Sequence, residues 1–152
     1  MAPTRWLDQD EQRSWRAFIE ATGLLMDQLD RELQRDAGMP HAYYEILVRL
    51  SEQPDRSLRM SELAERSQSS RSRVSHAVSR LEEAGWVRRA GISDDRRASL
   101  AVLTDEGFAA LAAAAPGHVE GVRRHLLDRL TPAQVRQLRR ISEAVRDPLL
   151  DR

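Results

Sequence analysis

The most constraining feature of this chain is a change in the periodicity of its apolar residues between positions 60 and 103. The first part has apolar side chains at three- and four-residue spacing, which is typical of helices, with a polar break in the middle. The second part alternates with a period of two, which is typical of strands. The expected elements are helices at 60–66 and about 70–84 and strands at 86–90 and 100–103, joined by a loop at 91–99.

Further helices are expected on both sides of this segment. An amphipathic pattern covers about 11–35, and a shorter one covers 41–51. Thr104 begins a helix that we expect to break at Pro116-Gly117 and to resume as far as Leu130. Thr131 and Gln134 form a capping box that begins the last helix. The predicted fold class is mainly α with a small β-hairpin (α+β).

Composition excludes several classes of function. The 152 residues contain no cysteine, which excludes disulfides, thiol catalysis and cysteine metal sites. No apolar run approaches the roughly 18 residues of a membrane span, and the N-terminus lacks a signal-peptide core, so a cytoplasmic protein without membrane contact is expected. There is no glycine-rich phosphate loop, no metal spacing among the four histidines and no nucleophile–base pair. We therefore expect neither an enzyme nor a cofactor.

The net charge of zero conceals an uneven distribution along the chain. All 24 basic residues are arginine, and they balance 24 acidic residues. Residues 1–55 carry 6 arginines and 11 acids, residues 56–97 carry 10 and 6, and residues 98–152 carry 8 and 7. The middle third is thus a basic segment, and it contains the two helices and the hairpin.

A helix, a short break, a second helix and a basic β-hairpin, in that order, define a winged helix-turn-helix. The major groove of DNA admits one helix, so a DNA-reading helix needs a polar outward face opposite an apolar inward one. On the second helix Val74 faces inward, while Ser72 and His76 face outward, and arginine is the commonest bidentate partner of guanine. The alternatives are a solvated arginine-rich surface and a winged-helix module that binds protein, which would present an apolar outward face.

At this point the sequence resembles the MarR family of bacterial transcriptional regulators. The resemblance covers nearly the whole chain, and its most specific part is the hairpin and the junction that follows it. The segments that carry it are Arg59–Ala64, Ser70–Glu82, Gly85–Arg89, Asp95–Arg97 and Leu100–Gly107. It implies a single MarR-like domain over 1–152, with a helical dimerisation layer at 10–36 and 104–150 and a winged helix-turn-helix DNA-binding lobe at 40–103.

The resemblance also implies a mechanism. A homodimer would bind a pseudo-palindromic operator in double-stranded DNA, as a repressor relieved by a small-molecule effector. Arg97 would enter the minor groove, and Asp95 would orient it through an ion pair. Taken with the outward face of the helix, this predicts the following DNA-contacting residues: Gln68, Ser69, Ser70, Arg71, Ser72, Arg73, Ser75, His76, Ser79, Arg80, Arg88, Asp95, Arg96 and Arg97.

The apolar stripes at 15–33 and 119–149 exceed what a small winged-helix lobe could cover, which favours burial between two chains. The alternative is a monomer whose helices pack on each other. The family's effector pocket lies between the dimerisation layer and the DNA-binding lobe, which points to Trp15, Arg16, His41, Tyr44 and His118. In the simpler interpretation Trp15 and Tyr44 are core aromatics and the histidines lie near helix ends.

Overall fold

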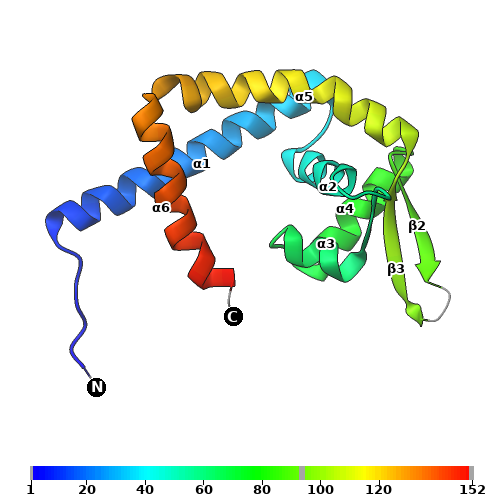
Figure 1. Ribbon diagram of the computed structural model, residues 1–152, viewed down its shortest axis with the longest axis horizontal. Helices are drawn as coiled ribbons and strands as arrows, with labels where there is room; N and C mark the ends of the chain where they lie inside the picture. Colours follow the sequence, from blue (N-terminus) through cyan, green and yellow to red (C-terminus); the bar gives the residue numbers. More distant parts are fainter. Residues whose placement is uncertain (1, 93–94, 151–152) are drawn as a thin grey trace. The chain divides into compact units, whose positions relative to one another are not determined.

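The computed structural model describes residues 2–92 and 95–150, with side chains for 2–91 and 99–150 (Figure 1). Within these residues the helical patterns of the sequence form six α-helices and one 3-10 helix, and the alternating segments form a three-stranded sheet. The elements are α1 (Gln9–Ala37), α2 (His41–Ser51), β1 (Ser57–Arg59), α3 (Met60–Arg66), α4 (Arg71–Glu83), β2 (Val87–Ile92), β3 (Asp95–Leu103), α5 (Asp105–His125), η1 (Leu127–Arg129) and α6 (Pro132–Leu150).

The chain divides into two compact units, and the winged helix-turn-helix lies entirely within residues 30–118. Its core is built from one face of each element. α2 contributes Leu47 and Leu50, α3 contributes Leu63, and α4 contributes Val78 and Leu81, and none of these five side chains is exposed. Leu58 of β1, Val87 of β2, and Ala101 and Leu103 of β3 close the core from the side of the sheet.

The sheet is antiparallel with the strand order β1-β3-β2. β1 was missed by the sequence analysis because three residues are too few to show a period of two. The hairpin is also longer than expected: β3 begins at Asp95, so the predicted loop at 91–99 is wrong over most of its length. Ala90 pairs with Leu100 and Gly91 with Ser99, and the register shifts between Gly91 and Ile92. The strands of the hairpin are held together by backbone hydrogen bonds, which form whether or not the side chains are apolar. The apolar pattern of the sequence therefore did not reveal this part of the hairpin.

α5 runs from Asp105 to His125 without the break expected at Pro116-Gly117. A proline inside a helix removes one backbone hydrogen bond and crowds the preceding turn. Here the preceding turn is Ala112–Ala115, and alanine has the smallest side chain that still strongly favours helix. Leu111 and Ala114 are buried in the core beside it. Packing and propensity therefore keep the helix continuous.

Side-chain hydrogen bonds cap the starts of three helices, and the capping box predicted at residues 131–134 is one of them. At α6 the Thr131 N–H donates to Gln134 Oε1 (2.9 Å) and the Gln134 N–H donates to Thr131 Oγ1 (3.3 Å), so the predicted capping box is present. Ser70 accepts a hydrogen bond from the Arg73 N–H at the start of α4. At α3 the cap residue is Arg59, whose N–H donates to Glu62 at 3.3 Å.

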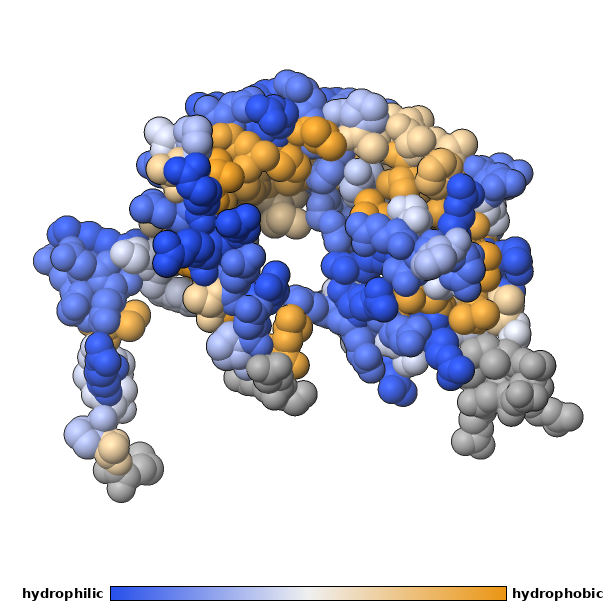
Figure 2. Space-filling model, in the orientation of Figure 1, coloured by the Kyte–Doolittle hydropathy of each residue, from blue (hydrophilic) through white to orange (hydrophobic). Residues whose placement is uncertain are grey.

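The other unit, which ends at Leu29 and resumes at Val119, leaves large apolar side chains open to solvent. Figure 2 shows apolar surface exposed on its helices. On α1 these side chains are Trp15, Phe18, Ile19, Leu24 and Met26, and on α6 they are Ile141, Val145, Leu149 and Leu150. No described helix combines the length and the apolar character that crossing a membrane requires.

The start of α5 is fixed against the residues that follow α4, and this contact requires glycine at position 107. Thr104 Oγ1 accepts a hydrogen bond from the Gly107 N–H (3.0 Å) and donates to the Gly85 carbonyl oxygen (2.7 Å). A Cβ at position 107 would collide with the Trp86 carbonyl oxygen and lie 2.8 Å from Leu103 Cδ1.

We therefore expect Gly107→Ala to lower the free energy of unfolding by about 1–3 kcal/mol, the usual cost of overpacking. Urea unfolding followed by circular dichroism measures the change. Gly117→Ala, in the same helix but with no atom near the added Cβ, is the control and should be stabilising by roughly 0.5–1 kcal/mol. Equal effects at the two positions would show that the contact with Trp86 is unimportant.

Candidate nucleic-acid interface

Helix α4 presents two faces of opposite character. Val74, Ala77, Val78 and Leu81 are buried, as the three- and four-residue spacing predicted. Ala84, at the predicted end of this helix, is exposed, because α4 ends at Glu83 and Gly85 turns the chain away with a φ of +76°. The face opposite the core is polar along its whole length.

The predicted contact residues of α4 are accessible, although not equally. Exposed side chains belong to Arg71, Ser72, Arg73, His76 and Arg80, and half-buried ones to Ser75 and Ser79. Arg80 forms an ion pair with Glu83 at 2.9 Å, and this hydrogen bond raises the pKa of Arg80. Among the described residues no hydrogen bond or ion pair reaches the side chains of Arg71, Arg73 and His76, so these groups are free for a partner.

The turn before α4 adopts a conformation that is uncommon for residues other than glycine. Gln68 has a φ of +49°, in the left-handed region, and its N–H donates to the Glu65 carbonyl oxygen at 3.0 Å. Gln68 lies in the four-residue turn that connects α3 to α4. Gln68 and Ser70 are exposed and Ser69 is half-buried at the N-terminal end of α4, where free backbone N–H groups favour a phosphate.

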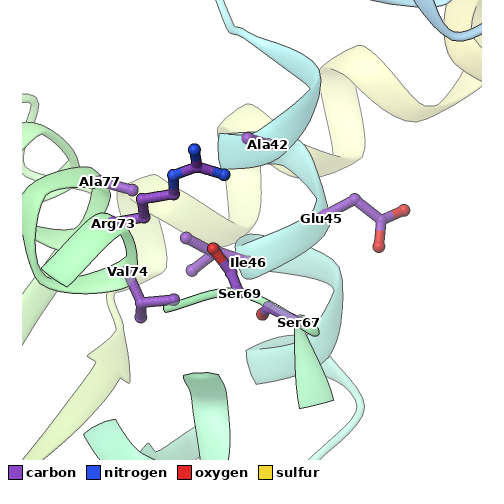
Figure 3. A pocket seen from close by; sticks show the side chains of 8 residues that line it. All are labelled: Ala42, Glu45, Ile46, Ser67, Ser69, Arg73, Val74 and Ala77. Carbon is purple, nitrogen blue, oxygen red and sulfur yellow. The ribbon is translucent and has the colours of Figure 1, made fainter. Parts of the chain in front are cut away.

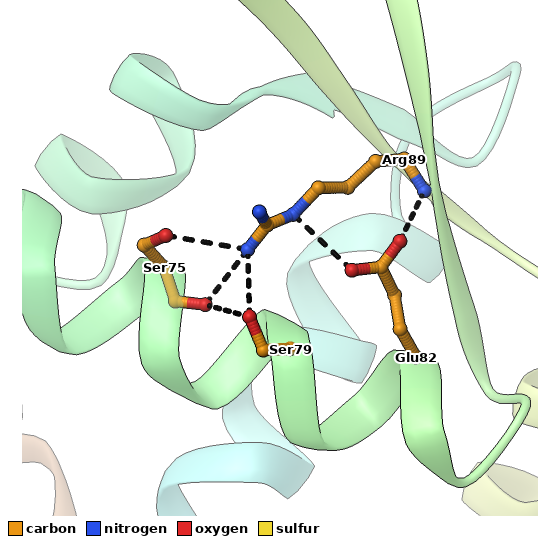
Figure 4. A network of polar contacts seen from close by, with 4 residues as sticks. All are labelled: Ser75, Ser79, Glu82 and Arg89. Atoms are coloured by element: carbon orange, nitrogen blue, oxygen red, sulfur yellow. Dashed lines mark hydrogen bonds and ion pairs between the residues drawn. The ribbon is translucent and has the colours of Figure 1, made fainter.

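A polar network joins the hairpin to α4 (Figure 4). The Arg89 guanidinium donates through Nη2 to the Ser75 carbonyl oxygen (2.8 Å), to Ser75 Oγ (3.2 Å) and to Ser79 Oγ (3.1 Å). Arg89 Nε pairs with Glu82 at 3.3 Å, and the Arg89 N–H donates to the other Glu82 oxygen at 3.0 Å. The hydroxyls of Ser75 and Ser79, predicted to face DNA, therefore already have a partner on β2.

The sequence analysis did not include Arg89 or Glu82 among the functional residues, although a signal was present. Consecutive side chains of a strand point to opposite faces, so one of Arg88 and Arg89 had to face α4. The structure shows that Arg88 is exposed and that Arg89 contacts the helix. The predicted hairpin residues Asp95, Arg96 and Arg97 belong to β3, and their side chains lie outside the described part of the molecule.

Two solved structures resemble this chain over almost its entire length. Sco3205 of Streptomyces coelicolor, a MarR family transcriptional regulator crystallised in complex with DNA, is 54% identical, with a TM-score of 0.93 over 97% of this chain and 92% of that one. AbsC, a MarR family transcriptional regulator of the same organism, is 41% identical, with a TM-score of 0.91 over 98% and 100%. The chain belongs to the MarR family of transcriptional regulators.

Shorter matches point to the same family. A family model described as "MarR family" matches residues 37–98, which contain the helix-turn-helix and most of the hairpin. The HTH-type transcriptional regulator PecS of Dickeya dadantii is 46% identical over 52 residues. That match spans 34% of this chain and only 31% of PecS. The MarR fold also agrees with the predicted class, mainly helical with a small antiparallel sheet.

Three of the five residues considered for an effector site form one aromatic cluster. Tyr44 is buried and its ring centroid lies 4.5 Å from that of His118, which lies 5.4 Å from that of His41. Nδ1 of His118 is buried without a hydrogen-bond partner among the described residues. Trp15 and Arg16 are both exposed and belong to the other unit, so the expectation that Trp15 is a core aromatic is wrong for the single chain.

We expect Arg89→Ala to lower the free energy of unfolding by about 1–2 kcal/mol, because it removes several hydrogen bonds at once. Urea unfolding gives the value, and amide hydrogen exchange in β2 should accelerate. Arg88→Ala is the matched control on the adjacent, exposed position of the same strand and should leave stability unchanged. A loss as large in Arg88→Ala as in Arg89→Ala would contradict a specific role for the network.

The histidine cluster predicts a pH dependence of stability. Burial and then the neighbouring His41 lower the pKa of His118 from its ordinary value of 6.5. The unfolded chain therefore binds more protons at this residue, and its contribution to stability decreases as the pH falls through 6.5. We expect His118→Asn to reduce the loss of stability between about pH 7.5 and about pH 5.5, measured by urea unfolding at each pH. If the free energy of unfolding changed with pH equally in the wild-type protein and in His118→Asn, this prediction would be wrong.

Proposed function

We propose that this MarR-family regulator is a homodimer that binds a pseudo-palindromic operator in double-stranded DNA and acts as a repressor relieved by a small molecule. The observation that carries the DNA-binding part is the outward face of α4. It is polar, and its arginines at positions 71 and 73 have no partner among the described residues. The DNA complex of Sco3205, 54% identical to this chain, supports the same function.

The predicted DNA-contacting residues differ in the part of the DNA that they would reach. The exposed residues of α4 and of the turn before it would enter the major groove, with arginine reading guanine and the helix N-terminus holding a phosphate. Arg88 would contact the phosphate backbone from β2. Asp95, Arg96 and Arg97 would reach the backbone or an adjacent minor groove, whose negative potential favours arginine, with Asp95 orienting Arg97. Ser75 and Ser79 contribute chiefly by holding Arg89.

The alternative function, a winged-helix module that binds protein without a DNA role, requires an apolar surface on α4. The exposed side chains of this helix are serine, histidine, arginine and glutamate. The basic character of residues 56–97 and the polarity of this face both favour DNA over a protein partner. The experiment that would identify the operator mixes the protein with fragments of the source genome and selects the fragments that it binds.

We expect Arg73→Ala and Arg97→Ala each to weaken operator binding by about tenfold or more at physiological salt. If these arginines contact phosphate, each substitution should also reduce the slope of the logarithm of the binding constant against the logarithm of the salt concentration by about one. Fluorescence anisotropy over a series of salt concentrations measures both. Arg13→Ala, on the exposed surface of α1, is the control. Unchanged affinity in both test variants would overturn the proposed DNA contacts.

The dimer is supported by the apolar surface of the unit formed by residues up to 29 and from 119. Ile141 is 62% exposed and Phe18 is 54% exposed in the single chain, an arrangement that water disfavours. A second copy of the chain would cover both stripes and hold two reading helices about 34 Å apart, the spacing of successive major grooves on one side of DNA.

We expect Ile141→Asp to convert the protein from a dimer to a monomer, because a buried unpaired charge is strongly unfavourable. Analytical ultracentrifugation distinguishes the mass of one chain, 17.3 kDa, from twice that value. Arg136→Asp places the same charge on the opposite face of α6 and should leave the dimer intact. A wild-type protein that sediments as a monomer would refute the proposed assembly.

A further inference from the structure

Two serines of α4 share the same arginine of β2 but use their hydroxyl protons differently. Ser79 donates its proton to the Ser75 carbonyl oxygen at 3.0 Å, one turn earlier, which is a common bond for a serine inside a helix. Ser75 makes no such bond, and its hydroxyl donates to no acceptor among the described residues. The Ser75 proton is therefore available to a partner outside the chain.

Arg89 fixes the direction of this proton. Its Nη2 donates to Ser75 Oγ at 3.2 Å and to the Ser75 carbonyl oxygen at 2.8 Å (Figure 4). A hydroxyl whose oxygen accepts from a cation turns its proton away from that cation, because the proton also carries positive charge. The same charge disfavours the approach of a second donor to Ser75 Oγ. Ser75 therefore acts as a donor, whereas an isolated serine donates or accepts according to its partner.

The Arg89 side chain is itself held in place. Its Nε pairs with Glu82 at 3.3 Å, and its backbone N–H donates to the other oxygen of the same carboxylate at 3.0 Å. The guanidinium is thus fixed by Glu82 at one edge and by Ser75 and Ser79 at the other. This arrangement keeps the positive charge beside Ser75 in the protein without DNA.

Arg73, on the same helix, lacks such support. It lines a cavity with Ala42 and Ile46 of α2, and Figure 3 shows its guanidinium extending from α4 towards α2. No hydrogen bond or ion pair reaches this guanidinium among the described residues. A long side chain without support can turn to whichever acceptor DNA offers. A short hydroxyl that is held at its oxygen is better suited to distinguish one base from another.

We propose that Ser75 is a specificity-determining residue, which donates its hydroxyl proton to a base in the major groove, and that Arg89 is the positioning residue that restricts it to donation. The proposal rests on the proposed function, in which α4 enters the major groove, and adds to the role of Ser75 in holding Arg89. Guanine N7 and O6 and thymine O4 are acceptors there, whereas cytosine N4 and adenine N6 are donors. Ser75 would favour a base pair that places an acceptor opposite its hydroxyl and reject one that places an amino group there.

The test uses the full-length protein and the operator obtained by selection from the genome. Each base pair of the operator half-sites is replaced in turn by every other base pair, and fluorescence anisotropy gives the affinities. At one position we expect the wild-type protein to prefer the operator base pair by about fivefold or more, the effect of one hydrogen bond. Ser75→Ala should reduce the preference to about twofold or less at that position alone.

Two further serine variants separate reading from holding. Ser79→Ala removes the other hydroxyl that accepts from Arg89, but the Ser79 proton is already used inside the helix. It should lower stability and keep the base preference. Ser61→Ala, on the exposed surface of α3, is the control and should change neither the affinity nor the preference.

Variants at Arg89 test its positioning role. Arg89→Met removes the charge and the donors, so the Ser75 hydroxyl can also accept, and base pairs that place an amino group opposite it should gain affinity relative to the operator pair. Arg89→Lys keeps the charge and should retain more of the preference than Arg89→Met. A ratio of affinities for two duplexes does not depend on the fraction of folded protein, so a loss of stability alone would not change it.

The outcomes distinguish this proposal from the proposed function. If Ser75→Ala kept the full preference at every position, the reading role of Ser75 would be refuted. If Arg89→Met kept the preference that Ser75→Ala lost, or if Arg89→Lys kept no more of it than Arg89→Met, the positioning role of Arg89 would be refuted. In each case sequence-specific binding by the wild-type protein would leave the proposed function intact, and only the absence of that binding would overturn both.

Discussion

The burial of one face of α4 is the constraint on which the rest of the structure depends. Val78 and Leu81 are completely buried against α2, α3 and the sheet, and Val74 is nearly so. A helix fixed on one side must present its other side to solvent in a single orientation. The polar face is therefore held in place by the core, and Arg71 and Arg73 are positioned although no hydrogen bond or ion pair reaches their side chains among the described residues.

The hairpin is attached to this helix by polar contacts at its base. Arg89 joins β2 to two serines and a glutamate of α4, so the position of the hairpin is linked to that of the reading helix. Because Glu82 is paired with Arg89 and Glu83 with Arg80, both acidic side chains in the last turn of α4 already have a basic partner. Within the described part of the chain, the arginines of α4 that have no hydrogen bond or ion pair are Arg71 and Arg73. They lie near the start of the helix, where the N–H groups that favour a phosphate are also found.

Much of the lobe could be predicted from the sequence because its signals are local. The spacing of Val74, Val78 and Leu81 identified the inward face of α4, and Thr131 and Gln134 identified the start of α6. Errors arose where distant residues decide the outcome. The strand at residues 57–59 exists only because it pairs with β3, and the polar start of β3 resembles a loop because its hydrogen bonds need no apolar pattern. Likewise, Pro116 is tolerated inside α5 because the surrounding turns are alanine-rich and partly buried.

By itself, the sequence determined the order of helices and strands, the basic segment at 56–97 and the resemblance to MarR regulators, because periodicity and charge are properties of neighbouring residues. Only the tertiary structure decided which polar side chains remain free. The sequence predicts that Ser75 and Ser79 face DNA, and the structure shows that their hydroxyls also accept hydrogen bonds from Arg89. Arg73 has no hydrogen bond or ion pair among the described residues. These distinctions depend on contacts between different elements of the chain. The alternation of a strand indicates that either Arg88 or Arg89 faces α4, but only the packing of β2 on α4 decides which one does.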